Sequence, residues 1–308
     1  MKLATRVLGV EFQNPVVLAA GTCGFGQELE DVIDLDALGG FVTKSVTLEP
    51  RRGNPAPRVT EFSGGMLNSV GLANPGLERT RSEKLPWIAR NVRRAQVLVS
   101  VAGHTVQEFF DLVEGLEDSE GFFGFEVNLS CPNDAKRDGL PFALDGEAVS
   151  EIVNGCRARS ARPLVAKLAP NDPDVAGTAR RAVDAGADAL TLTNTLPGLL
   201  LHARSGRTEL GAGAGGVSGP ALRPSGVRAV REARRVTEAP IFGVGGVLGP
   251  ADAVGYARAG ADLVQIGTAT FAAPRAGEGL VSGLRAWGRR NGIHAWTDLV
   301  GGVVEGGS

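Results

Sequence analysis

Two segments of the chain share one pattern: residues 182–190 read AVDAGADAL, and residues 256–264 read YARAGADLV. Each begins as a helical run, reaches a Gly suited to a helix C-cap, turns through Ala-Asp and continues into an apolar strand. A helix that leads directly into a buried strand is a building unit of α/β folds. The repeat therefore predicts parallel strands with helices between them.

Apolar runs of strand length recur along the whole chain, each followed by a polar or Gly-rich loop. Continuous rather than alternating apolar runs indicate a parallel sheet that is covered on both faces. Eight such runs favour a (β/α)8 TIM barrel, and a doubly wound sheet is the alternative. The expected strands are residues 16–20, 41–46, 97–101, 125–129, 164–168, 189–193, 241–244 and 263–266.

The remaining pattern fits this barrel without a break in composition, so we expect one domain over residues 1–308. Residues 3–12 predict a short N-terminal hairpin around Gly9. Two long connections, residues 49–76 and 196–220, each follow a strand and would be loop insertions at the C-terminal rim, where barrel active sites form. Helices are expected at residues 105–116, 146–159, 174–185, 226–237 and 251–259.

Composition narrows the possible partners and location. The formal net charge of -2 argues against a nucleic-acid or anionic-membrane partner. No apolar run of membrane-spanning length occurs, and residues 1–6 lack the apolar core of a signal peptide. The three cysteines, Cys23, Cys131 and Cys156, have neither disulfide-framework nor zinc-site spacing. We expect a cytoplasmic protein without a metal site.

The last two strand ends carry glycines, in residues 243–246 (GVGG) and 267–269 (GTA). Glycine lets backbone N–H groups approach an anion, and the loops after strands seven and eight of barrels often bind phosphate. Ser218 and Gly219 close the preceding loop and could add to this site. A phosphate site is therefore predicted.

Other strand ends carry amines, carboxamides and a thiol. Lys44 and Lys167 interrupt apolar strands, which predicts a cation that faces a bound anion or, alternatively, a Schiff-base lysine. Cys131 follows a strand and is the candidate for proton chemistry. The side chains of Asn68, Asn128, Asn133 and Asn194 suit a flat ligand with alternating N–H and C=O groups.

Five segments, taken in order, make the chain resemble the dihydroorotate dehydrogenases. Residues 128–133 (NLSCPN) resemble that family's catalytic loop. Residues 52–58 (RGNPAPR) and 65–72 (GMLNSVGL) resemble its substrate loops, and residues 215–221 (GGVSGPA) and 243–247 (GVGGV) resemble its flavin-phosphate segments. The resemblance implies an FMN-dependent oxidation of dihydroorotate to orotate in pyrimidine biosynthesis.

The resemblance also implies roles for individual residues. Cys131 would be the base and Lys44 a second catalytic residue. The substrate would contact Lys44, Asn68, Ser69, Val70, Gly71, Leu72, Asn128, Asn133, Asn194 and Thr195. FMN would contact Ala20, Gly21, Lys44, Ser45, Ser100, Asn128, Lys167, Thr193, Gly219, Gly245, Gly246, Gly267 and Thr268.

A Cys base resembles the soluble class 1 enzymes, and residues 65–76 resemble the catalytic subunit of their NAD-linked type. The resemblance implies a homodimer, or a heterotetramer with a subunit that carries FAD and an iron–sulfur cluster. Three cysteines are too few for this chain to hold such a cluster itself. Residues 134–144 and 199–211 depart from the NAD-linked pattern, so fumarate remains an alternative electron acceptor.

Other reaction classes share some of these features. A dihydropyrimidine dehydrogenase-like flavoprotein would share the barrel, FMN and the cysteine. A flavin-dependent tRNA dihydrouridine synthase and a non-catalytic FMN-binding protein are further alternatives.

Overall fold

The computed structural model describes residues 1–129 and 141–304. A closed barrel of eight parallel strands lies at its centre, in the order β10-β13-β14-β3-β4-β7-β8-β9. The predicted (β/α)8 TIM barrel is therefore confirmed, and the doubly wound alternative is wrong. The strands are β3 (Val16–Leu18), β4 (Gly40–Val42), β7 (Gln96–Val101), β8 (Gly124–Asn128), β9 (Leu164–Leu168), β10 (Ala189–Leu192), β13 (Ile241–Val244) and β14 (Leu263–Ile266).

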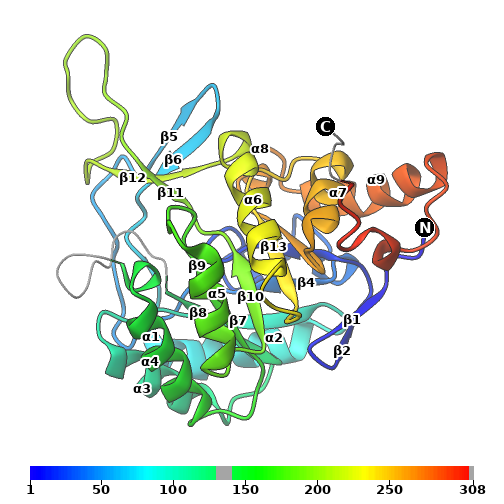
Figure 1. Cartoon of the computed structure of the whole chain (residues 1–308). Helices are drawn as coiled ribbons and strands as arrows, with labels where there is room; N and C mark the ends of the chain where they lie inside the picture. The colour runs from blue at the N-terminus through cyan, green and yellow to red at the C-terminus, as the bar shows by residue number, and fades with distance from the viewer. Residues whose placement is uncertain (130–140, 305–308) are drawn as a thin grey trace.

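Helices surround this barrel (Figure 1). Side chains cap several of them at the predicted starts: Thr105 accepts a bond from Glu108 N, and Asp174 accepts one from Gly177 N. The five predicted helices are α3 (Val106–Leu116), α4 (Gly146–Arg157), α5 (Val175–Asp184), α6 (Arg223–Arg234) and α7 (Pro250–Ala259). The structure adds α1 (Gly76–Arg79), a π-helical turn (Thr80–Lys84), α2 (Leu85–Asn91), α8 (Ala269–Ala272) and α9 (Ala276–Arg290).

The N-terminal hairpin is present as β1 (Thr5–Val7) and β2 (Val10–Phe12), paired antiparallel. Leu8 and Gly9 take φ values of 53° and 78° in its turn. Phe12 is buried against the barrel residue Phe242, with ring centroids 6.3 Å apart in an edge-on arrangement. The hairpin thus packs against an apolar layer inside the barrel, which also contains Val165 and Leu263.

The two long connections form a sheet of their own. Strands β5 (Val59–Phe62) and β6 (Gly65–Asn68) come from the first, and β11 (Leu196–Gly198) and β12 (Gly215–Ser218) from the second. They pair in the order β11-β12-β6-β5. The predicted insertions are thus present, but they contain strands where long loops without regular structure were expected. Figure 1 shows the β5–β6 hairpin extending away from the barrel.

Candidate active site

A cavity lies at the carboxyl ends of the barrel strands. The space among its lining residues amounts to ≈ 1220 Å³, including solvent at the open mouth. Barrel strand ends provide most of its wall, and β6 and β12 add Met66, Asn68, Gly216 and Ser218. The sheet made by the two insertions therefore helps to enclose the cavity.

Most residues predicted to bind substrate or cofactor line this one cavity. They come from separate parts of the sequence, and the closed barrel brings them together because all parallel strands end on the same side. The lining set contains Ala20, Gly21, Lys44, Ser45, Asn68, Val70, Gly71, Leu72, Asn128, Lys167, Thr193, Asn194, Thr195, Gly219, Gly245, Gly246, Gly267 and Thr268.

Two predicted residues lie behind the wall instead. Ser100 is fully buried, and its Oγ lies 2.8 Å from Ser45 Oγ. Ser69 is also fully buried, and its hydroxyl accepts a hydrogen bond of 2.7 Å from the Asn54 side chain. Cys131 and Asn133 lie outside the described residues.

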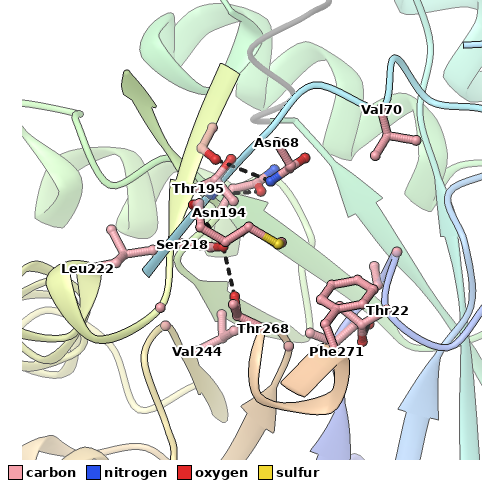
Figure 2. Close-up of a pocket in the computed structure, with 18 of the residues that line it drawn as sticks. Thr22, Asn68, Val70, Asn194, Thr195, Ser218, Leu222, Val244, Thr268 and Phe271 are labelled. Carbon is pink, nitrogen blue, oxygen red and sulfur yellow. Dashed lines mark hydrogen bonds between the residues drawn. The ribbon is translucent and has the colours of Figure 1, made fainter. Parts of the chain in front are cut away.

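Hydrogen bonds join the polar side chains of several strand ends. Asn128 Nδ2 donates to Ser45 Oγ over 3.3 Å, and Asn194 Nδ2 donates to Asn128 Oδ1 over 3.3 Å. The backbone N–H of Thr195 donates to Asn194 Oδ1 over 2.8 Å. Figure 2 shows Asn194, Thr195 and Asn68 gathered on one side of the cavity, away from Thr22 and Phe271. This side offers the fixed amide donors and acceptors that a planar polar ligand requires.

A glycine-lined part of the cavity, called the glycine cradle below, lies where β12, β13 and β14 end. Gly219, Gly245 and Gly246 have φ values of 93°, 122° and 67°, which L-residues rarely adopt. A Cβ on Gly246 would lie 2.7 Å from Gly219 O, so the backbone segments are packed too closely for a side chain. Thr268 Oγ1 donates to Ser218 Oγ over 2.7 Å beside them (Figure 2).

Tyr256 supports this cradle from behind and was missed by the sequence analysis. Its buried hydroxyl donates to Val244 O over 3.0 Å and Gly245 O over 2.8 Å. Burial raises the pKa of Tyr256, so the hydroxyl remains a donor. Tyr256 is the single tyrosine of the sequence and lies in the second helix–Gly-Ala-Asp repeat, which gave no sign of this contact.

Lys167 lies at the floor of the cavity in a buried polar cluster. Its Nζ is 3.3 Å from Glu126 Oε1, and Glu126 is fully buried. Thr191 Oγ1 and Gln265 Nε2 bond the other carboxylate oxygen, over 2.9 and 3.2 Å. Lys167 was predicted to face a bound anion or to form a Schiff base. The structure instead pairs it with Glu126, a residue that the sequence analysis did not single out because it lies within an apolar strand pattern.

The other two cysteines, Cys23 and Cys156, are buried. Burial raises the pKa of Cys23 to about 12, and the nearby Glu28 carboxylate adds to the increase. Burial likewise raises the pKa of Cys156 to about 12. Both thiols therefore stay protonated at neutral pH and are poor candidates for a base. Among residues 1–129 and 141–304, no three His, Cys, Asp or Glu side chains group as a metal site.

No helix within the described ranges has the length and apolar character needed to cross a membrane.

Comparisons with known proteins identify the family of the chain. The family model described as dihydroorotate dehydrogenase matches residues 2–286. A Pelobacter propionicus protein, named dihydroorotate dehydrogenase B (NAD(+)), catalytic subunit, is 40% identical over 301 residues, covering 98% of each chain. A Geotalea uraniireducens protein of the same name is 39% identical over 302 residues, again covering 98% of each.

A further relative carries a different name. A Solibacter usitatus protein, provisionally named dihydroorotate dehydrogenase A (fumarate), is 43% identical over 300 residues, covering 97% of this chain and 98% of its own. The matches extend over nearly the full length in each case. The chain therefore belongs to the dihydroorotate dehydrogenase family.

Proposed function

We propose that the protein oxidises dihydroorotate to orotate with bound FMN, in the biosynthesis of pyrimidines. One observation carries this proposal: a single cavity combines a glycine cradle for a phosphate with a cluster of carboxamides for a planar polar ring. A family match over residues 2–286 supports the same reaction. FMN supplies the hydride acceptor when bound.

The residues of the cavity fit FMN. Gly219, Gly245 and Gly246 line the cavity without side chains, so their backbone would be open to a phosphate, and Ser218 and Thr268 add hydroxyls beside it. Thr193 lines the same cavity, and its Oγ1 is buried without a hydrogen-bond partner in the described part of the chain. A buried hydroxyl without a partner is costly, so a bound polar group would complete it.

The substrate side is proposed to hold a carboxylate and a pyrimidine ring. Lys44 would pair with the carboxylate, because it lines the cavity and its ammonium lies beside Gly21. Asn68, Asn128 and Asn194 would bind the ring N–H and C=O groups, and Thr195 would add a hydroxyl. Because these side chains come from fixed strand ends, they would hold the ring in one orientation for reaction.

Cys131 is the proposed base that takes the C5 proton, with Asn133 as a further ring contact. Both residues lie beyond the described part, so their support is the sequence segment 128–133 and the unsuitability of the two buried thiols. With the C5 proton taken by Cys131, and FMN present as the hydride acceptor, dihydroorotate would be left with the double bond of orotate. The cytoplasm, as a reducing compartment, is the proposed location because Cys23 and Cys156 are free thiols.

The proposed acceptor is NAD, reached through a partner subunit. The names of the Pelobacter and Geotalea relatives support a partner, because each is a catalytic subunit. We propose that this partner carries FAD and an iron–sulfur cluster, in a heterotetramer built on a homodimer of this chain. Fumarate is the alternative, supported by the name of the Solibacter relative.

The substrate and the acceptor can be tested separately. Purified protein should turn over dihydroorotate and not dihydrouracil with an artificial dye acceptor; turnover of dihydrouracil alone would contradict the substrate. Protein purified from its native cells should co-purify with an iron–sulfur protein, and the complex should reduce NAD. Reoxidation of the isolated chain by fumarate would contradict the NAD-linked assignment and leave the substrate assignment standing.

A further inference from the structure

The barrel interior changes from apolar to polar just below the cavity. Alternate residues of a barrel strand face inward, so each strand contributes successive residues to stacked layers. The layer next to the N-terminal hairpin contains Val165, Ala189 and Leu263. Two positions further along the same strands stand Lys167, Thr191 and Gln265, and they meet Glu126 of β8.

This polar layer centres on one carboxylate. Glu126 has an exposed fraction of 0%, as do Thr191 and Gln265, whereas Lys167 is 5% exposed and lines the cavity. Gln265 reaches Glu126 from β14, which lies opposite β8 in the order of the eight strands. The carboxylate is therefore held from three other strands, with the lysine on its cavity side.

Packing alone does not account for a buried charge here. Barrel interiors are usually filled by branched apolar side chains. Desolvation of an ion pair can cost more than its attraction returns, and apolar replacements of such pairs are often no less stable. The carboxylate of Glu126 lies behind the cavity-lining Lys167, and it therefore lowers the net positive charge that the cavity floor presents to a ligand.

That charge matters for the proposed reaction. A hydride carries two electrons and one proton, so FMN that accepts it gains one negative charge. A lone ammonium near the ring would favour the reduced cofactor, and a carboxylate 3.3 Å behind the ammonium opposes that effect. Charges inside a water-poor interior act strongly because little solvent screens them.

We propose that Glu126 is a positioning residue that fixes Lys167 and, by offsetting its charge, lowers the reduction potential of bound FMN. This inference rests on the proposed function, because it requires FMN in the cavity. A lower potential keeps reduced FMN able to pass its electrons on. Thr191 and Gln265 hold the carboxylate in place from the far side and carry no charge themselves.

The test is a cycle of four FMN-bound proteins: wild type, Glu126→Gln, Lys167→Met, and the double variant. Potentials are measured by equilibration with redox dyes. Glu126→Gln should raise the potential by at least a tenfold shift in the reduced-to-oxidised ratio, about 30 mV for a two-electron couple. Lys167→Met should lower it, and the double variant should return toward wild type because the net charge of the pair is zero in both.

Thr191→Val is the matched control. This variant loses the hydrogen bond of 2.9 Å from Thr191 Oγ1 to the Glu126 carboxylate but keeps every charge. The reduction potential of its bound FMN should therefore stay near that of the wild type. Unfolding by urea is measured on every variant. A merely structural Glu126 would lower the stability of Glu126→Gln without moving the potential, and that result would overturn the inference.

Failure of one variant to fold leaves the test intact. If Glu126→Gln does not fold, comparison of Lys167→Met with the double variant measures the same carboxylate, because both lack the lysine. Equal potentials for those two proteins would overturn the inference. If the wild-type protein is yellow and is reduced by dihydroorotate, but the potentials of the four proteins do not follow the expected order, the inference is contradicted and the proposed function stands. Wild-type protein that binds no FMN contradicts the proposed function as well.

Discussion

Asn194 Nδ2 donates a hydrogen bond to Asn128 Oδ1 across 3.3 Å, which joins the ends of β10 and β8, two strands that are not neighbours in the barrel. Asn128 in turn donates to Ser45 beyond the end of β4. The bonds fix the rotation of each carboxamide and so fix which edge is a donor and which an acceptor. A ligand that binds here meets a pattern set before it arrives.

Replacement of Asn194 by Ala should therefore lower kcat/KM for dihydroorotate by about 10- to 100-fold, the equivalent of about 1–3 kcal/mol for a buried polar group left without its partner. FMN should stay bound, since Asn194 lies with Asn68 and Thr195 on the side of the cavity that is proposed to hold the substrate. Steady-state kinetics and the visible flavin spectrum check both points. Asn91→Ala is the control: Asn91 is exposed at the end of α2 and makes one similar bond, to Trp87 O over 2.8 Å. Equal kinetics for the two variants would contradict a substrate role for Asn194.

Replacement of Gly246 by Ala should weaken FMN binding by more than tenfold. The added Cβ would meet Gly219 O at 2.7 Å and would force a residue with a side chain into a φ of 67°. Fluorescence titration of the apoprotein with FMN measures the dissociation constant. Gly255→Ala is the matched control, because that glycine lies within α7 with nothing within 4 Å of an added Cβ. The control should bind FMN normally and be slightly more stable, by about 0.5–1 kcal/mol. Unchanged FMN affinity in Gly246→Ala would remove this glycine from the cradle.

Replacement of Tyr256 by Phe should reduce both stability and FMN affinity. The change removes the hydroxyl that donates to Val244 O and Gly245 O, and it leaves two buried carbonyls without that donor. The expected loss in the free energy of unfolding is about 1–3 kcal/mol. Urea unfolding of the apoprotein and FMN titration of the folded protein separate the two effects. A variant that loses stability but binds FMN as well as wild type would show that Tyr256 supports only the fold.

The buried thiols predict an alkaline limit to stability. Cys23 and Cys156 have a pKa of about 12 when folded, raised from an ordinary value of 9.0 by burial. Above pH 9 the unfolded chain releases these protons and the folded chain does not. Their contribution is thus fully present below pH 9 and declines as pH rises toward 12. Urea unfolding between pH 8 and about 10.5 should show the fall, and a Cys23→Ala, Cys156→Ala variant should show a shallower one.

The same burial predicts protection from thiol reagents. In a Cys131→Ala variant at neutral pH, the folded protein should take up no reagent, and the unfolded protein should react at both remaining cysteines. Rapid reaction of the folded variant would contradict the burial of Cys23 and Cys156.

The strands and the site were predictable because each depends on local signals. Apolar runs mark the eight barrel strands, and the strand ends follow from these runs. Lys44, Asn128 and Asn194 lie at or just beyond such ends, so they could be assigned to one cavity. The sheet of β5, β6, β11 and β12 could not be predicted, because Gly216 pairs with Asn68, a residue distant in sequence. Short Gly-containing strands give little β-propensity to detect.

Other misses have similar physical causes. Helix α9 contains four glycines, which weaken a helical signal. Tyr256 of α7 and Glu126 of β8 matter through contacts with other elements of the fold, and no local sequence pattern records those contacts. Ser69 lies between Asn68 and Val70, which line the cavity, yet it points behind the wall because neighbouring positions alternate in an extended chain.

The central claim is tested most directly by anaerobic titration of the purified yellow protein with dihydroorotate. The claim predicts that the visible flavin absorbance bleaches and that one orotate forms for each FMN reduced. The Cys131→Ala variant should bind FMN and orotate but bleach far more slowly. A flavin that stays oxidised with dihydroorotate, and bleaches with dihydrouracil instead, would contradict the account.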